Sequence, residues 1–120
     1  MYILALNGSH NNDGNTAFLL NEILRHCAEK GAETEICSVS EAIMDTKTPF
    51  CVACSTPCTK KCYKDTKLDT LFDKIERADF VVFGSPVYFG SMTGQMKCFF
   101  LTRQGTQELI KSGSESLWRR

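Results

Sequence analysis

The sequence predicts an α/β fold, a doubly wound parallel sheet with crossover helices. Short apolar runs alternate with segments of helical periodicity, in the order strand, helix, strand, irregular loop, helix, strand, helix. A polar, glycine-containing loop joins the first strand to the first helix, at the edge where such sheets bind ligands. The pattern contains three strands, and a five-stranded sheet would need two more. At about 30 residues for each strand with its helix, that is about 60 further residues. We therefore expect a sheet truncated after the third strand and its following helix.

Hydrophobic periodicity predicts the elements of the first half. The apolar run at 2–6 predicts the first strand. A helix is expected next, from apolar residues at helical spacing: Ala17, Leu20, Leu24, Cys27 and Ala28. Gly31 suits the position just after a helix C-terminus. Residues 33–39 predict a second strand, and the polar residues around Ile36 are typical of a sheet edge.

The second half repeats the alternation after an interruption. Residues 42–63 contain two prolines and a group of cysteines, so we expect this segment to be irregular. The next helix is predicted by four apolar residues at helical spacing: Leu68, Leu71, Phe72 and Ile75. The continuous apolar run at 80–83 predicts a strand buried on both faces. Residues 93 to about 103 predict the last helix.

Composition limits the classes of function. At 120 residues the chain is expected to form one domain, residues 1–120, and 42% hydrophobic with 23% charged residues is ordinary for a globular protein. Basic and acidic residues balance at 14 each, which gives no support to binding nucleic acid or an acidic membrane. We find no signal peptide and no apolar run of membrane-spanning length, so we expect a cytoplasmic protein.

The loop at 7–16 is the first candidate binding site. Its amides, the following helix N-terminus and the side chains of Ser9, Asn15 and Thr16 can surround a phosphate without a strong cation. Five residues separate Gly8 from Gly14, and Asn15 stands where a nucleotide triphosphatase loop has lysine. A phosphate monoester such as the tail of FMN fits this pattern. An ordinary loop with a capped helix stays open as the alternative.

The loop at 84–94 is the second candidate. It offers backbone amides beside Tyr88 and Phe89, which suits a flat, partly polar ring, and its glycines permit close approach. The alternative is a turn whose aromatic residues cover the edge of the core. Both loops follow strands that meet where the strand order of an open sheet switches, and together they favour a ligand site.

These loops resemble those of the NADPH-dependent FMN reductase superfamily, which has the flavodoxin-like fold. The resemblance is carried by Asn7-Gly8-Ser9, Gly14-Asn15-Thr16, Ala78-Asp79, the run from Gly84 to Ser91, and Gln95-Met96-Lys97. It implies that FMN phosphate is held by Ser9, Asn11, Asn15 and Thr16. It implies that the flavin ring is lined by Ser85, Pro86, Val87, Tyr88, Phe89 and Gly90. It also implies NAD(P)H as co-substrate and a homo-oligomer.

Three features depart from the family pattern. His10-Asn11 replaces a common Pro-Arg pair, which removes an arginine charge, and Thr102-Arg103 replaces a usual Asp-Arg pair. The family also continues through two further strands that are not found in this sequence. Those strands carry part of the flavin pocket in the family and cover the outer edge of the third strand.

Seven cysteines are many for this length, and four lie in the loop at 50–63 as Cys51-x2-Cys54-x3-Cys58-x3-Cys62. In a reducing compartment such a group indicates metal rather than disulfides. Four thiolates at short, irregular spacing can hold a [4Fe-4S] cluster, and the loop most resembles that of the iron–sulfur flavoproteins. A zinc site and a loop without metal stay open.

The sequence therefore predicts an FMN-dependent NAD(P)H oxidoreductase of iron–sulfur flavoprotein type. Electrons would pass from the pyridine nucleotide through FMN to a small-molecule or redox-protein acceptor, and no side chain need act as acid or base. Two alternatives stay open. One is a flavodoxin-like electron carrier, and the other is a truncated, non-catalytic remnant with a zinc-bound cysteine loop.

Overall fold

Three parallel strands form the centre of the molecule, with β1 between β2 and β3. The structure, a computed structural model, describes residues 1–48, 50–52 and 59–102. Along the chain these form β1 (Tyr2–Asn7), α1 (Asn15–Glu29), β2 (Glu33–Ser38), α2 (Val39–Met44), α3 (Lys67–Arg77), β3 (Phe80–Gly84) and α4 (Gly94–Leu101). The parallel α/β fold expected from the sequence is confirmed, and β2 is an edge strand of the described sheet.

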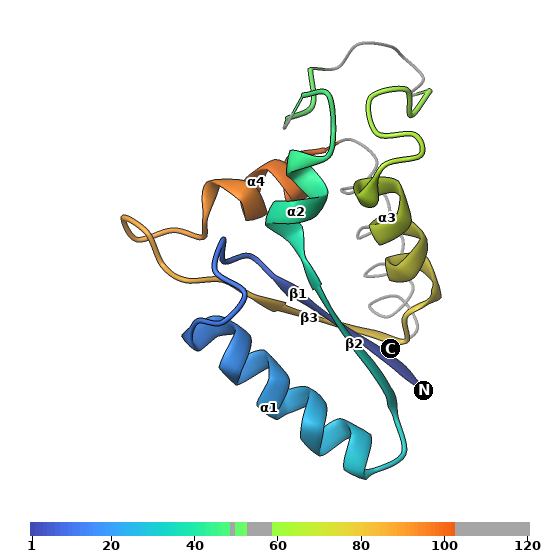
Figure 1. The fold of residues 1–120 in the computed structure, drawn as a ribbon, viewed down its shortest axis with the longest axis vertical. Helices are drawn as coiled ribbons and strands as arrows, with labels where there is room; N and C mark the ends of the chain where they lie inside the picture. The colour runs from blue at the N-terminus through green and yellow to red at the C-terminus, as the bar shows by residue number, and fades with distance from the viewer. Residues whose placement is uncertain (49, 53–58, 103–120) are drawn as a thin grey trace, which may run out of the picture.

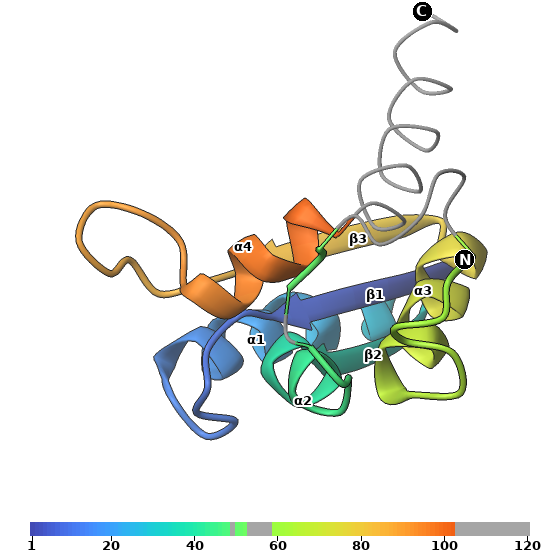
Figure 2. The same cartoon turned by 90° about the horizontal axis from the view of Figure 1, so that it is seen from above.

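Helices cover both faces of the sheet. Figures 1 and 2 show α1 on one face and α2, α3 and α4 on the other. The alternation of side chains along β1 explains the two layers, because successive residues of a strand point to opposite faces. Leu4 and Leu6 belong to the core on the side of α2, α3 and α4, whereas Ile3 and Ala5 pack with Leu20 and Leu24 of α1.

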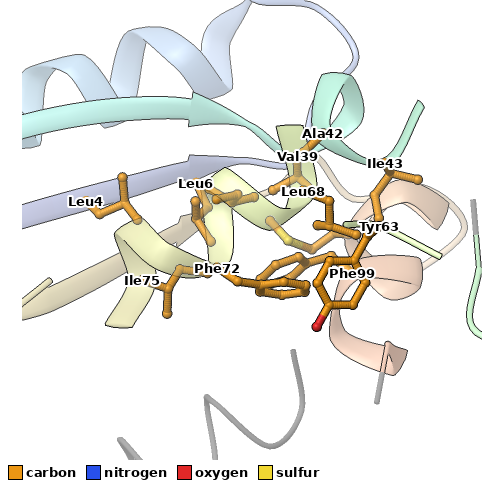
Figure 3. Close-up of a cluster of buried hydrophobic side chains, with 12 residues drawn as sticks. Leu4, Leu6, Val39, Ala42, Ile43, Tyr63, Leu68, Phe72, Ile75 and Phe99 are labelled. Carbon is orange, nitrogen blue, oxygen red and sulfur yellow. The ribbon is translucent and has the colours of Figure 1, made fainter. Parts of the chain in front are cut away.

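The larger core contains the aromatic side chains that fix α3 and α4. The rings of Phe72 and Phe99 stack with centroids 5.7 Å apart, and Tyr63 meets Phe72 edge to face at 5.1 Å. Figure 3 shows these rings beneath Leu4 and Leu6. The buried members are Leu4, Leu6, Val39, Ala42, Ile43, Tyr63, Leu68, Leu71, Phe72, Ile75, Met96 and Phe99. The segment before α3 is thus anchored to the core through Tyr63.

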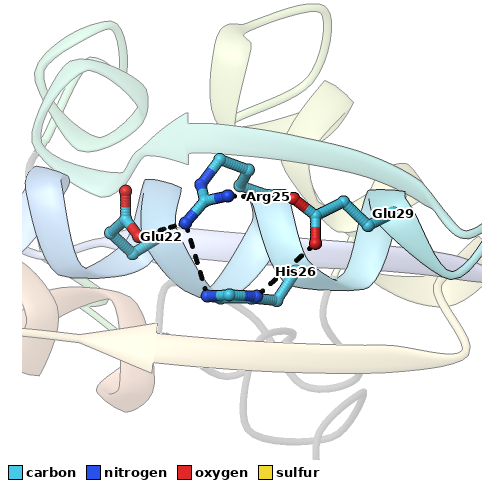
Figure 4. Close-up of polar contacts among 4 residues, drawn as sticks. All are labelled: Glu22, Arg25, His26 and Glu29. Atoms are coloured by element: carbon cyan, nitrogen blue, oxygen red, sulfur yellow. Dashed lines mark hydrogen bonds and ion pairs between the residues drawn. The ribbon is translucent and has the colours of Figure 1, made fainter.

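Helix α1 follows the expected amphipathic pattern. Ala17, Leu20 and Leu24 are buried, and Gly31 after the helix has φ +90°, a conformation that glycine adopts without strain. The opposite face carries ion pairs, drawn in Figure 4, in which Arg25 lies 2.9 Å from both Glu22 and Glu29. These pairs are exposed, so each contributes little to stability.

Helix α2 was not predicted from the sequence. It runs from residue 39, expected to end the second strand, into the segment 42–63 that was expected to be irregular, and β2 ends at Ser38. The Ser38 side chain accepts a hydrogen bond from the amide of Glu41, which caps the helix N-terminus. A serine followed three residues later by glutamate is a capping signal, and this signal was present in the sequence.

The expectation that β3 is buried on both faces is wrong for this structure. Phe80 is 59% exposed and Phe83 is 40% exposed. Within the described residues β3 has a strand on one side only, so its other edge is open and its side chains are only partly covered. Phe83 is partly covered by the ring of Phe100, with centroids 5.0 Å apart.

No helix in the described part of the chain is long and apolar enough to cross a membrane.

Candidate ligand-binding site

The two candidate loops lie side by side at the carboxyl ends of β1 and β3. Asn7 and Gly84 are paired in the sheet, and the Gly8 amide donates to the Gly84 carbonyl at 2.7 Å. A side chain at Gly8 would be crowded at this contact, because its Cβ would lie 3.1 Å from the Gly84 oxygen and 2.7 Å from Met96 Cε. The structure therefore brings together the loops that the sequence placed at the switch point.

A chain of side-chain acceptors shapes the first loop. Asn7 Oδ1 accepts from the Ser9 amide at 3.0 Å, Ser9 Oγ accepts from the Asn11 amide at 3.1 Å, and Asn11 Oδ1 accepts from the Asp13 amide at 2.9 Å. Each side chain thus folds the backbone two residues ahead. These bonds use the side-chain oxygens as acceptors. The Ser9 hydroxyl hydrogen and the Asn11 side-chain amide hydrogens stay available for donation.

The N-terminus of α1 completes a set of donors. Gly14 precedes the helix and has no side chain to cap it, and the first turn contains no acidic residue. Among the described residues, the amides of Asn15, Thr16 and Ala17 have no hydrogen-bond acceptor. Unpaired amides at a helix N-terminus favour an anion, and a phosphate monoester fits this donor set. Asn15 is exposed and Thr16 is half-buried beside these amides.

The outer part of this loop is fastened to α2 rather than left free. His10 Nδ1 lies 3.1 Å from Ser40 Oγ, and the Asn12 side-chain amide donates to Glu41 at 2.9 Å. His10 is exposed, and its ring is directed at Ser40. These contacts fasten the outer part of the loop to α2.

The second loop forms a tight hairpin that projects from the body of the molecule (Figures 1 and 2). Tyr88 and Ser91 exchange backbone hydrogen bonds of 2.8 and 3.1 Å, and the residues between them, Phe89 and Gly90, both have positive φ. Two such residues define a type I′ turn. Val87, Tyr88 and Phe89 are exposed, so their side chains do not cover the edge of the core. This observation disfavours the alternative in which the loop only seals the core.

The start of the second loop is anchored by polar contacts. Ser85 Oγ accepts from the Thr93 amide at 3.1 Å and donates to the Pro86 carbonyl at 2.9 Å. Ser85 and Pro86 are half-buried, in contrast with the exposed tip. The residues expected to line a flavin ring are thus divided between a fixed base and a projecting apolar tip.

Sequence reasoning missed two buried polar residues that build the site. Asn7 is 2% exposed and starts the chain of acceptors in the first loop. Thr93 caps α4 and its hydroxyl donates to the Gly8 carbonyl at 2.6 Å. A threonine directly before a helix is a capping signal that the sequence shows. Its contact with the first loop cannot be recognised from the neighbouring residues in the sequence.

The cysteine group lies only partly within the described residues. Cys51 is exposed, and Cys62 is half-buried against the larger core beside Tyr63. Cys54 and Cys58 lie outside the described residues. The described part of the chain contains no group of three or more side chains placed to hold a metal ion, and the four-cysteine site stays a prediction.

A charged network lies at the other end of the sheet, away from both loops. Lys74 Nζ lies 2.5 Å from Glu35, and the Tyr2 hydroxyl donates to the same carboxylate. The bond from Lys74 lowers the pKa of Glu35, and the bond to Glu35 raises the pKa of Lys74. Burial, followed by the bond to Glu35, raises the pKa of Tyr2 to about 12.

A cavity of about 280 Å³ is lined partly by this network. It lies against β2, α2 and α3, and its lining residues include Glu35, Cys37, Lys67 and Lys74. Burial raises the pKa of the Cys37 thiol, although Lys74 Nζ lies 3.8 Å from its sulfur. Within this cavity Glu35 already pairs with Lys74, whereas the amides at the N-terminus of α1 have no acceptor among the described residues. We therefore place the candidate site at the loops.

Comparison with known proteins finds a matching family model and similar curated proteins. Residues 1–106 match the family model of NADPH-dependent FMN reductase. An iron–sulfur flavoprotein of Methanocaldococcus jannaschii is 34% identical over 99 residues, which cover 81% of this chain and 49% of that protein. One from Archaeoglobus fulgidus is 34% identical over 97 residues, covering 81% and 46%. One from Methanosarcina thermophila is 28% identical over 102 residues, covering 83% and 51%. The chain spans about half the length of the curated relatives it matches.

Proposed function

Because the chain belongs to the NADPH-dependent FMN reductase family, we propose that it binds FMN and works as a flavin-dependent oxidoreductase. The observation that carries the proposal is the set of unpaired donors at the N-terminus of α1, beside an exposed aromatic hairpin. A phosphate would bind the unpaired donors, and a flat ring would pack against the aromatic hairpin. Both occur at one edge of the sheet.

The phosphate of FMN would be bound by hydrogen-bond donors alone. The Ser9 hydroxyl, the Asn11 side-chain amide and the backbone amides of Asn15 and Thr16 all retain hydrogens to donate. The helix dipole favours the negative charge without a lysine or arginine in the loop. The Asn15 and Thr16 side chains would add further donors.

The second loop would hold the ring. Its base, Ser85 and Pro86, is fixed against α4, and its tip offers the apolar surfaces of Val87, Tyr88 and Phe89, with Gly90 allowing close approach. FMN supplies the redox chemistry when bound, since its ring takes a hydride from NAD(P)H and passes electrons on. The protein's part is to bind and orient the ring and to limit access of water.

We also propose that Cys51, Cys54, Cys58 and Cys62 hold a [4Fe-4S] cluster that receives electrons from the flavin. The relatives named as iron–sulfur flavoproteins support this assignment, as do four thiolates at short spacing. Lys60, Lys61 and Lys64 lie next to the last of these cysteines and would offset the negative charge of the cluster. The final acceptor would be a small molecule or a redox protein.

The test is binding of FMN and of riboflavin, which lacks the phosphate, to the full chain purified without oxygen. We expect FMN to bind and NADPH to reduce it. Asn15→Asp should weaken FMN at least about tenfold, by placing a negative charge at the phosphate, and should leave riboflavin affinity unchanged. An acidic residue in the first turn stabilises a helix, so this loss would not reflect unfolding.

The matched control is Asn21→Asp, an exposed change on the same helix but away from its N-terminus. It should leave both affinities unchanged. A wild-type chain that takes up neither FMN nor riboflavin would contradict the proposal, and FMN that NADPH does not reduce would indicate an electron carrier. Iron and sulfide near four per chain are expected on the same sample, whereas zinc alone would overturn the cluster assignment.

A further inference from the structure

One buried residue, Thr93, joins the two candidate loops and the helix that follows them. Its side chain is almost completely buried, with the whole residue 1% exposed. Its hydroxyl donates to the Gly8 carbonyl at 2.6 Å and accepts from the Met96 amide at 3.3 Å. Its own amide donates to Ser85 Oγ at 3.1 Å. A single threonine thus contacts the first loop, the base of the second loop and the first turn of α4.

The hydrogen-bond partners of Thr93 lie at positions that determine the course of both loops. The Gly8 carbonyl directly precedes Ser9, the second acceptor in the chain that shapes the first loop, and Ser85 lies at the base of the loop that carries the hairpin. Thr93 and Gly8 are 85 residues apart in sequence. Within the described residues, the only other hydrogen bond between the two loops is that from the Gly8 amide to the Gly84 carbonyl, at the strand ends.

We propose that Thr93 is a positioning residue that sets the spacing between the two loops, so that one FMN molecule can be held by both. This inference rests on the proposed function. One FMN molecule carries both the phosphate and the ring, so the two loops must contact it at the same time. If the spacing is not fixed beforehand, part of the binding free energy is spent on fixing it. Thr93 supplies that fixed spacing through side-chain and main-chain contacts.

The experiment compares three variants of the full chain. Thr93→Val keeps the size and branching of the side chain but removes the hydroxyl, whereas Thr93→Ser keeps the hydroxyl and loses a methyl group. Thr102→Val is the matched control, because Thr102 is also buried, directly after α4, and its hydroxyl donates to the Phe99 carbonyl at 2.9 Å. Phe99 lies within α4 and belongs to neither loop.

We expect Thr93→Val to weaken FMN at least about tenfold, and Thr93→Ser to stay within about threefold of wild type. Thr102→Val should lower the melting temperature to a similar degree without changing FMN affinity. The proposal is overturned if Thr93→Val binds FMN as wild type does, if Thr93→Ser is as weak as Thr93→Val, or if Thr102→Val is equally weak.

A second readout needs no flavin and separates the two proposals. Amide hydrogen exchange in the flavin-free protein should become faster in Thr93→Val at Ser9 and Asn11 and, together with them, at Tyr88 and Ser91. Thr102→Val should leave these four amides unchanged. If wild type binds no FMN but exchange changes in both loops, the proposed function fails while the coupling by Thr93 holds. Unchanged exchange in both loops refutes the coupling itself.

Discussion

The two ends of the sheet are held together by different chemistry. At the amino end of the strands, charged groups meet: Lys74 contacts Glu35, Tyr2 donates to the same carboxylate, and the Arg77 guanidinium lies 6.0 Å from the centroid of the Tyr2 ring. At the carboxyl end, uncharged side chains fold the loops. Asn7 and Thr93 are buried there and bond to backbone groups.

The difference teaches which end is closed and which is built to receive a ligand. At the amino end, the Glu35 carboxylate already accepts from Lys74 and Tyr2. At the carboxyl end, the side-chain oxygens of Asn7, Ser9 and Asn11 accept bonds within the loop, and hydrogens are left over. An anion such as a phosphate would bind the donors left over at the carboxyl end, whereas at the amino end Glu35 already supplies the negative charge.

The largest effect is expected for Asn7→Ala. This change leaves the buried Ser9 amide without its acceptor and removes the first bond of the acceptor chain. We expect the free energy of unfolding to fall by about 2 kcal/mol, and FMN affinity to fall with it, because a buried donor without a partner carries its full desolvation cost. Chemical denaturation at neutral pH measures the stability change.

The control for Asn7→Ala is Asn12→Ala, an exposed asparagine of the same loop, which should change stability by less than about 0.5 kcal/mol. Because the bonds of Asn7 involve no charged group, the loss should be equal at low and high salt. A loss that shrinks markedly in high salt would mean that the carboxyl end is organised by charge after all, and the comparison would break.

The fold could largely be predicted because its signals are local. Buried positions of α1 and α3 recur at helical spacing, and β1 is a continuous apolar run. Helix α2 was not predicted because six residues are too few to show a helical periodicity. The capping pair of Ser38 and Glu41 does mark its start. The burial of β3 was mistaken because an apolar run shows that a strand can be buried, whereas its neighbours decide whether it is.

The site was predictable to the level of its loops but not of its supports. The sequence indicates a polar glycine loop before a helix and an aromatic loop after a strand, and the parallel sheet brings them together. The acceptor role of Asn7 and the bridge made by Thr93 depend on contacts between segments far apart in sequence. No spacing rule in one sequence reveals such a contact.

A smaller effect on stability is expected for Tyr2→Phe at the amino end, and this effect depends on pH. The pKa of Tyr2 rises from 10.0 to about 12 on folding, so the unfolded chain releases the phenol proton first. Stability from this group is therefore complete below pH 10 and falls as pH rises towards 12. The variant should lose about 1 kcal/mol at neutral pH and show a shallower alkaline fall.

Urea unfolding of wild type and Tyr2→Phe from pH 8 to about 11.5 measures both effects. The alkaline fall should persist in part, because Lys74 also has a raised pKa and its contribution is lost as pH rises above 10.5. Asn7→Ala should keep the wild-type alkaline slope. Parallel curves for wild type and Tyr2→Phe would show that the phenol is not part of the charged network in solution.

The smallest effect on stability is expected at the tip of the hairpin, where Phe89→Asn should be stabilising. Phe89 has φ 52° at the first central position of a type I′ turn, a position that asparagine followed by glycine occupies with little strain. Its ring is fully exposed, so the replacement loses no core contact. We expect the free energy of unfolding to rise by about 0.5 kcal/mol, as strain is relieved.

The same change should weaken FMN, since a strained aromatic residue at an exposed tip makes physical sense only if its ring contacts something else. Thermal unfolding and FMN titration of Phe89→Asn, with Phe89→Tyr as the variant that keeps an aromatic ring, test this reasoning. Higher stability with weaker binding would show that the carboxyl end gives up stability for a ligand contact, as the amino end does not. Unchanged FMN affinity in Phe89→Asn would remove the hairpin tip from the site and leave ring binding to Tyr88 and the loop base.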